Sequence, residues 1–124
     1  RDLMHSGEAL PLVTLTMPMM QTVIEISSKR LGVAVVLDAD KRLAGIVTDG
    51  DLRRGLERWG KELYDMDTAA IMTRSPRVIY EDELAAKALS IMETQSITSL
   101  VVPDQNGFVK GIIHIHDMLR SGIV

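Results

Sequence analysis

Two short segments of this sequence place a polar side chain three residues before an aspartate, where a helix is expected to begin. They are Thr48-x-x-Asp51 and His114-x-x-Asp117. Unpaired backbone N–H groups and the helix dipole favour an anion at such a position, and a carboxylate can accept hydrogen bonds from two ribose hydroxyls. Both segments are therefore candidate contacts for a ligand that carries a phosphate and a sugar.

The first segment also has a purely structural explanation. Thr48 and Asp51 can form a capping box, in which each side chain satisfies the backbone N–H of the other residue. Asp49 lies beside them and would repel a phosphate unless Arg53 or Arg54 compensates. Arginines on a helix face can meet an anionic ligand, but they are usually solvated or in weak ion pairs. The sequence leaves both interpretations open.

The second segment departs from the first, because His114 replaces the threonine and His116 stands where the first segment has Gly50. Imidazole is a poor N-cap, so helix capping explains this segment less well. The histidines could donate to a phosphate or carboxylate, more strongly when protonated near or below pH ~6.5. They could instead chelate a metal with Asp117, or simply be partly exposed at a helix start. Arg120, further along the expected helix, is a candidate for the same anion.

Both segments belong to an internal repeat. Gly45-Ile46-Val47, which precedes the first segment, returns 66 positions later as Gly111-Ile112-Ile113 before the second segment. Two copies that cannot each bury a hydrophobic face usually bury one against the other. We therefore expect an α/β (α+β) fold of two pseudo-symmetric repeats, each a small β-sheet with two packing helices.

Hydrophobic periodicity and turn residues predict the same elements in each repeat. The first repeat is expected to contain a helix over 19–31, strands over 33–37 and 43–47, and a helix over 50–59. The second is expected to contain a helix over 84–92, strands over 100–102 and 109–113, and a final helix from His114. A short strand is also expected before each set, near Val13 in the first repeat and near Ile79 in the second. The core stripe of the first helix is expected to be Met20, Val23, Ile24, Ser27 and Leu31.

The repeat divides the chain into residues 1–60, a linker over 61–70 and residues 71–124. The linker is polar and charged, so we expect it to cross the surface. Residues 2–4 and 70–72 resemble each other as an entry element of each repeat, although their offset is 68 rather than 66.

Composition narrows the class of protein. A chain of 124 residues with 46% hydrophobic residues is sufficient for one core and short for two independent domains. A net charge of −3 without a long basic run makes nucleic acid an unexpected partner. The absence of cysteine excludes disulfides, thiol catalysis and thiolate metal sites, and it fits a reducing cytosol.

No apolar run approaches the roughly 18 residues of a membrane span, and the start lacks the pattern of a signal peptide. We therefore expect a cytoplasmic protein without a membrane partner. Because the sequence opens on Arg1 rather than Met, we also expect it to be a piece of a longer protein.

The repeat plan, with a Gly-apolar-apolar strand leading to an aspartate near each helix start, resembles a tandem pair of cystathionine β-synthase (CBS) domains, or Bateman module. The resemblance covers nearly the whole chain. Three segments, residues 45–54, 72–78 and 114–120, are similar to the C-terminal half of D-arabinose 5-phosphate isomerases of the KpsF/GutQ type. In that family the isomerisation belongs to a sugar-isomerase domain that precedes the CBS pair. The resemblance thus implies a regulatory fragment and no catalytic residue.

The resemblance also implies a site. Nucleotide-binding CBS domains use the Thr or Ser of the first segment toward phosphate and its Asp toward ribose, so His114 puts the phosphate contact of the second copy in doubt. A base would lie against apolar side chains and strand backbone around four positions, Val13, Val33, Ile79 and Ser99. The expected effector is a nucleotide or nucleotide-sugar, with the cytidine-activated octulosonate or an adenine nucleotide as candidates, and no cofactor is required. CBS pairs commonly associate through their helices, which predicts a homodimer.

Three other functions are open from the sequence. The chain could be a structural dimerisation module whose Thr and Asp residues are only helix caps, or a standalone CBS protein that senses adenine nucleotides. Alternatively, His114, His116 and Asp117 could form a proton-transfer centre for an aldose–ketose isomerisation. The chain lacks another obvious base or a sugar-phosphate cradle for that reaction.

Overall fold

A computed structural model describes residues 4–83, 85–95 and 97–120 of the chain. The chain forms two compact units, and neither coincides with one sequence repeat. Unit 2 is Pro11–Pro76, and unit 1 combines Arg1–Leu10 with Arg77–Val124. The chain therefore begins in unit 1, passes into unit 2 and returns.

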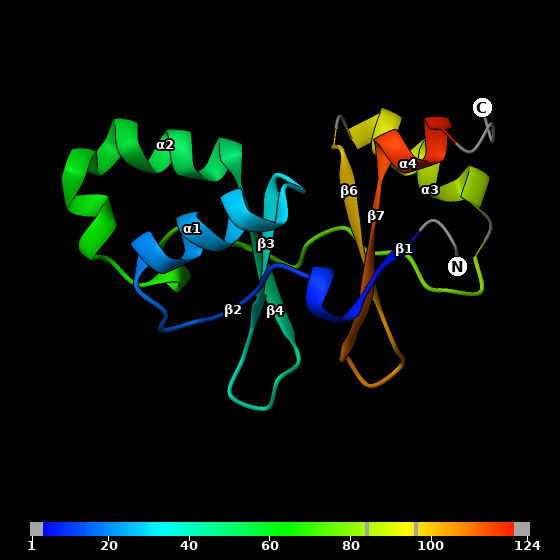
Figure 1. Ribbon diagram of the computed structural model, residues 1–124, viewed down its shortest axis with the longest axis horizontal. Helices are drawn as coiled ribbons and strands as arrows, with labels where there is room; N and C mark the ends of the chain where they lie inside the picture. Colours follow the sequence, from blue (N-terminus) through cyan, green and yellow to red (C-terminus); the bar gives the residue numbers. More distant parts are fainter. Residues whose placement is uncertain (1–3, 84, 96, 121–124) are drawn as a thin grey trace. The chain divides into compact units, whose positions relative to one another are not determined.

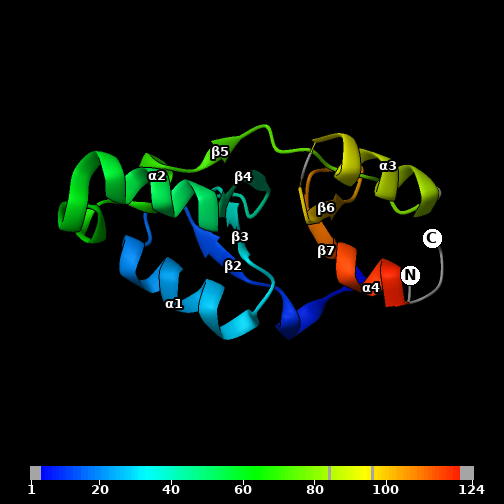
Figure 2. The ribbon, with the colours of Figure 1, turned by 90° about the horizontal axis from the view of Figure 1, so that it is seen from above.

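Unit 2 contains a four-stranded sheet in the order β2-β3-β4-β5. Its elements are β2 (Leu12–Thr14), α1 (Met19–Lys29), β3 (Val33–Leu37), β4 (Leu43–Thr48), α2 (Asp49–Trp59), the 3₁₀ helices η2 (Gly60–Asp65) and η3 (Thr68–Ala70), and β5 (Thr73–Arg74). Strand β2 is parallel to β3, whereas β3–β4 and β4–β5 are antiparallel pairs. Helices α1 and α2 run beside each other next to this sheet (Figures 1 and 2).

Unit 1 contains a three-stranded sheet in the order β1-β7-β6, with both pairs antiparallel. Its elements are β1 (Met4–His5), the 3₁₀ helix η1 (Gly7–Ala9), α3 (Ala85–Gln95), β6 (Ser99–Pro103), β7 (Val109–His114) and α4 (Ile115–Arg120). The short strand expected near Ile79 is reduced to an isolated parallel bridge between Val78 and Val101. Near Val13, by contrast, the expected strand is β2.

Each unit has its own hydrophobic core. The core of unit 2 comprises Val13, Ile26, Ala34, Val36, Val47 and Met72, and that of unit 1 comprises Ile79, Ala88, Leu89, Met92, Leu100, Val102 and Met118. Strand β3 is apolar throughout and its first four residues are buried, as expected for a strand covered on both faces. The predicted α/β fold with small sheets and packing helices is confirmed.

The predicted core stripe of the first helix is wrong. Helix α1 buries Met19, Thr22 and Ile26, whereas Met20 and Ile24 are exposed. The reason is that a polar residue, Thr22, is part of the buried face. Its hydroxyl is hydrogen-bonded to the Thr68 hydroxyl at 2.5 Å, and this bond allows the polar side chain to be buried. A pattern of apolar residues alone therefore misplaces the stripe.

Most of the segment 61–70 lies at the surface, but it is folded and not extended. It forms η2 and η3 and fully buries Leu63 and Thr68. Leu63 packs against Gly55 of α2, where a Cβ atom would lie 3.1 Å from both Leu63 methyl groups. The Thr68 hydroxyl donates to the Met17 carbonyl at 2.7 Å. The division into residues 1–60, 61–70 and 71–124 therefore stays a prediction about the sequence repeats only.

The entry element of each repeat pairs with the sheet that holds the other repeat's hairpin. Strand β5, which opens the second repeat, pairs with β4 in the register Gly45↔Arg74. Strand β1, which opens the first repeat, pairs with β7 in the register His5↔Ile112. The two repeats thus exchange their entry strands, and this exchange explains why the compact units and the repeats differ.

Glycine permits the exchange. A Cβ atom on Gly45 would lie 2.5 Å from the Thr73 carbonyl oxygen, and one on Gly111 would lie 2.5 Å from the His5 carbonyl oxygen and overlap Met4. Real Cβ atoms do not approach a backbone oxygen so closely. The repeated Gly-apolar-apolar motif therefore leaves room for the backbone of the exchanged strand.

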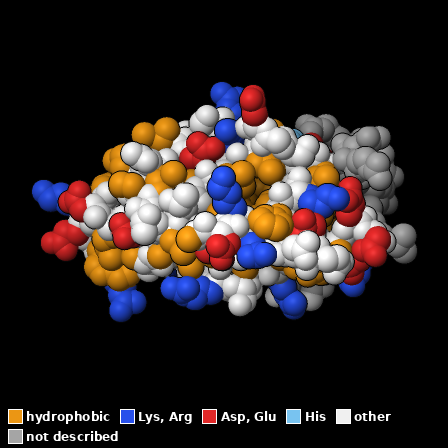
Figure 3. Space-filling model, turned by 90° about the horizontal axis from the view of Figure 1, so that it is seen from below, with side chains coloured by type: hydrophobic (Ala, Val, Ile, Leu, Met, Phe, Trp, Pro, Cys, Tyr) orange, Lys and Arg blue, Asp and Glu red, His pale blue; other side chains and the backbone are white. Residues whose placement is uncertain are grey.

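On the face shown in Figure 3, basic and acidic side chains are interspersed among apolar and uncharged ones. Among the described residues, no helix has the length and apolar character needed to cross a membrane.

We predict that Gly111→Ala and Gly45→Ala each lower the free energy of unfolding by about 1–3 kcal/mol, because the new methyl group forces the exchanged strand away. Urea unfolding measures the change, with Lys110→Ala as the control, because Lys110 is exposed beside Gly111. Hydrogen exchange should accelerate at Met4 and His5 in Gly111→Ala. An unchanged exchange rate there would contradict the proposed packing.

Candidate functional site

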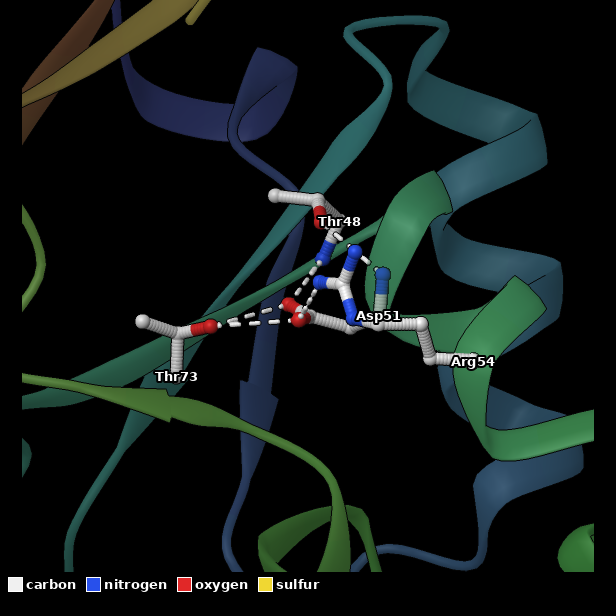
Figure 4. Close-up of polar contacts among 4 residues, drawn as sticks. All are labelled: Thr48, Asp51, Arg54 and Thr73. Atoms are coloured by element: carbon white, nitrogen blue, oxygen red, sulfur yellow. Dashed lines mark hydrogen bonds and ion pairs between the residues drawn. The ribbon is translucent and has the colours of Figure 1, made fainter. Parts of the chain in front are cut away.

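The first candidate site is built at the junction of β4 and α2. Thr48 ends β4 in an extended conformation and is the N-cap of α2. Its hydroxyl accepts a hydrogen bond from the Asp51 backbone N–H at 3.1 Å, and its own N–H donates to Asp51 Oδ2 at 2.9 Å. The capping box is therefore present, and Figure 4 shows both contacts.

The Asp51 carboxylate has further partners that a simple cap does not need. Arg54 Nη2 donates to Oδ1 at 2.7 Å, and the Thr73 hydroxyl lies 3.2 Å from both carboxylate oxygens. Asp51 is 7% exposed. A carboxylate buried to this extent must be paired and hydrogen-bonded, and here three different segments of the chain hold it. Its orientation is fixed before any ligand arrives.

The arginine in this site reaches the surface. The Arg54 side chain is 64% exposed, whereas that of its partner Asp51 is 7% exposed. The Arg54 Nη1 atom lies 3.2 Å from the position that a Cβ on Gly50 would occupy, so the guanidinium folds back over the first turn of α2. Asp49 and Arg53 are both exposed on that helix. The site thus combines a buried anion with an exposed cation.

The second candidate site is built at the junction of β7 and α4. His5 Nε2 lies 2.6 Å from Asp117 Oδ2, and the two side chains are 35% and 17% exposed. His114 immediately precedes α4, and its Nδ1 accepts a hydrogen bond from the His116 backbone N–H at 3.2 Å. This segment therefore has one cap contact, whereas the full capping box is formed at Thr48 and Asp51. An imidazole nitrogen takes the part of the missing hydroxyl, because Nδ1 can accept when it carries no proton.

Two residues of these sites were missed from the sequence, Thr73 and His5. Each lies on an exchanged entry strand and contacts the aspartate of its unit. The offset of 68 that relates residues 2–4 to residues 70–72 also relates His5 to Thr73, so an alignment of the two entry elements could have found this pair. The sequence does not show that each entry strand joins the sheet of the other repeat.

The four positions predicted to face a base separate into two pairs. Val33 and Ser99 lie directly opposite the capping residues, in the registers Val33↔Thr48 and Ser99↔His114. Val13 and Ile79 belong to the hydrophobic cores of their units. Contacts of all four with a ligand stay predictions. The predicted contact from Arg120 concerns a side chain outside the described part of the structure.

The three histidines do not form a metal centre in the part of the chain that the structure describes, where no group of three or more His, Cys, Asp or Glu residues could hold a metal ion. The rings of His114 and His116 instead meet edge to face, with their centroids 4.8 Å apart.

Comparison with protein families identifies both repeats. The family model "CBS domain" matches residues 1–58 and 68–123. The chain is 42% identical over 123 residues to arabinose 5-phosphate isomerase KdsD of Pseudomonas aeruginosa, and 36% identical to KdsD of Escherichia coli K12. Each match covers 99% of this chain and 37% of the relative, in its C-terminal part. The chain thus spans little more than a third of the length of these relatives.

Solved structures share the fold at low sequence identity. CBSX2, crystallised in complex with AMP, has a TM-score of 0.84 and 22% identity, and the match covers 98% of this chain and 93% of that one. Protein MJ1225 of Methanocaldococcus jannaschii has a TM-score of 0.87 and 23% identity, covering 98% of this chain and 46% of that one. Protein PAE2072 of Pyrobaculum aerophilum, complexed with AMP, has a TM-score of 0.77 and 24% identity over 86% of this chain and 81% of that one.

We predict that Asp51→Ala lowers the free energy of unfolding by about 1–3 kcal/mol, because it removes the carboxylate half of the capping box and leaves the Thr48 N–H without its partner. Asp49→Ala is the matched control, since Asp49 is an exposed aspartate in the same helical turn and its loss should cost about 0.5 kcal/mol. Urea unfolding of both variants measures the difference. Equal losses would mean that the partners of Asp51 do not stabilise the fold.

Proposed function

This chain belongs to the CBS-domain family, and from that premise we propose that it is a non-catalytic regulatory module that binds a nucleotide or nucleotide-sugar. The observation that carries the proposal is the first site. A buried carboxylate with both oxygens already oriented lies beside an exposed guanidinium at a helix start. The carboxylate suits two ribose hydroxyls, and the helix start together with Arg54 suits a phosphate.

A ligand would engage this site by exchanging partners. Arg54 can leave Asp51 Oδ1 and contact the phosphate, which would free that oxygen for a ribose hydroxyl. Thr48 N–H and the Thr73 hydroxyl would continue to hold the carboxylate in place. The AMP complexes of CBSX2 and PAE2072, which share this fold, support a nucleotide as the class of ligand.

The regulated partner in this proposal is a sugar-isomerase domain. Relatives at 36–42% identity include arabinose 5-phosphate isomerases, and the match lies in their C-terminal part. An end product of the octulosonate branch that such isomerases feed, the cytidine-activated octulosonate, is the proposed effector, with adenine nucleotides as the alternative. A ligand regulates only if it binds one arrangement of the protein better than another. A cytoplasmic location is part of the same proposal.

A thermal-shift titration tests the ligand class. AMP, ATP, S-adenosylmethionine, CMP, the cytidine-activated octulosonate and arabinose 5-phosphate are each added in large excess. A ligand at about 100 times its Kd should raise the Tm by on the order of 5 °C or more. The shift should become smaller in Asp51→Asn and in Asp117→Asn, because each variant weakens one of the two sites, and it should persist in Asp40→Asn, which changes an exposed turn carboxylate.

The outcomes of this titration separate the candidate functions. A shift with AMP but none with the cytidine compounds would favour a sensor of adenine nucleotides. No shift with any compound would contradict nucleotide sensing and leave a structural dimerisation module, in which Thr48 and Asp51 act only as a cap. Isomerisation of arabinose 5-phosphate by this chain alone would contradict a non-catalytic role.

We further propose a homodimer that forms through the helices. Exposed apolar side chains on α1 and α2 support this, namely Met20, Ile24 and Leu56. Surface residues of this kind mark association surfaces when they gather on one face.

We predict that Ile24→Glu weakens self-association at least about tenfold, because it places a charge at a contact that must be desolvated. Sedimentation equilibrium measures the dissociation constant, and Ala39→Glu, in an exposed turn, is the control. A monomeric wild-type chain would contradict the proposed dimer.

A further inference from the structure

All three histidines of the chain belong to one site. The sequence contains His5, His114 and His116 and no other histidine. His5 contacts Asp117, and His114 contacts the His116 backbone N–H and ring. At the equivalent positions of the other site, unit 2 has Thr73, Thr48 and Gly50. The two sites therefore share one backbone plan, but only the site in unit 1 carries imidazoles, which can take up a proton.

The strand register explains how the histidines converge. His5 lies opposite Ile112 across the β1–β7 pair, and opposed residues of antiparallel strands project from the same face of the sheet. His114 is two residues further along β7 and shares that face. Asp117 reaches the same region from α4, where its Oδ2 atom lies 2.6 Å from His5 Nε2.

The two sites hold their aspartate with different kinds of group. In unit 2 the Asp51 carboxylate is held by a threonine hydroxyl, a backbone N–H and a guanidinium, and neither the hydroxyl nor the guanidinium titrates near neutral pH. In unit 1 the place of Thr73 is taken by His5, whose imidazole gains a positive charge when it takes up a proton. A protonated His5 still donates to Asp117, and it makes the site more attractive to an anion.

The titratable groups around His5 are known from the elements that pack against it. Helix α4 contributes Asp117 and His116, and β7 contributes His114. Strand β6, the other neighbour of β7, has no titratable residue over Ser99–Pro103. On the outlying parts of the unit, Glu8 of η1 is exposed, and Lys110 at the start of β7 is paired with Glu81 at 2.6 Å.

We propose that His5 is the positioning residue that holds Asp117 for a ligand hydroxyl, and that the three histidines make unit 1 a proton-linked site for a ligand with a phosphate or carboxylate group. This inference rests on the proposed nucleotide-binding function and specifies its second site. The ligand binds there with uptake of protons by the imidazoles. Its affinity rises as the pH falls, whereas the site in unit 2 gains no protein charge over the same range.

Calorimetric titration with AMP tests the proton linkage. The background variant Asp51→Asn weakens the site in unit 2, so that binding reports on unit 1. In this background the affinity for AMP should be at least about threefold higher at pH ~6 than at pH ~8, with proton uptake visible as a dependence of the binding enthalpy on the buffer. The AMP phosphate itself titrates near pH ~6, so the conclusion is drawn from comparison with His5 variants.

Two substitutions separate positioning from proton uptake. His5→Gln retains an N–H donor at the reach of Nε2 but cannot take up a proton. At pH ~8 this variant should bind AMP as tightly as the background does. At pH ~6 it should lose a large part of the increase in affinity that the background shows. His5→Ala removes the donor and should bind more weakly at both values. Glu8→Gln, which changes an exposed acid close to β1, is the control and should behave as the background does.

The results distinguish this inference from the proposed function. If AMP binds and His5→Gln shows the same pH dependence as the background, His5 takes up no proton and the proton linkage is overturned while nucleotide sensing stands. If His5→Ala binds AMP as tightly as the background, the positioning role is overturned. If AMP does not bind at all, both nucleotide sensing by AMP and proton-linked binding fail.

A measurement without ligand decides the positioning role in every case. In ¹⁵N NMR of the imidazoles at pH ~8, His5 should carry its proton on Nε2, and Asp117→Asn should shift the His5 signal far more than Asp49→Asn does. A proton on Nδ1, or a signal that does not respond to Asp117→Asn, would overturn the contact.

Discussion

The close approach of an exchanged strand to a glycine is the constraint on which both candidate sites depend. Gly45 and Gly111 each lie where a Cβ atom would be 2.5 Å from a carbonyl oxygen of the entry strand. Only a residue without a side chain allows this distance. Because the entry strand can lie so close, its side chain reaches the start of the following helix, where Thr73 meets Asp51 and His5 meets Asp117.

One backbone plan therefore carries two different chemistries. In unit 2 the aspartate is held by a hydroxyl, a backbone N–H and the exposed guanidinium of Arg54. In unit 1 the corresponding positions carry imidazoles, and even the helix start is capped by the Nδ1 atom of His114. The two units therefore present different hydrogen-bonding groups beside the equivalent aspartates.

The exchange also links each site to a particular part of the chain. Strand β1 has only two residues, Met4 and His5, and it contacts the site through a side chain as well as through the β7 ladder. In the isomerase relatives, the remainder of the protein precedes the segment that this chain matches.

The repeat, the type of fold, nearly all of the helices and strands, and the aspartates at the two helix starts could be predicted from the sequence. These follow from local rules, since periodicity, turn residues and capping act within a few positions. The buried face of α1 could not be predicted in this way, because Thr68 satisfies the buried Thr22 from a distant segment and this contact forms only in the folded chain. The tertiary structure also decided that Leu63 is a core residue and that Thr73 and His5 complete the sites. Strand exchange joins residues that are 22 and 112 positions apart, and no local pattern specifies which sheet an entry strand will join.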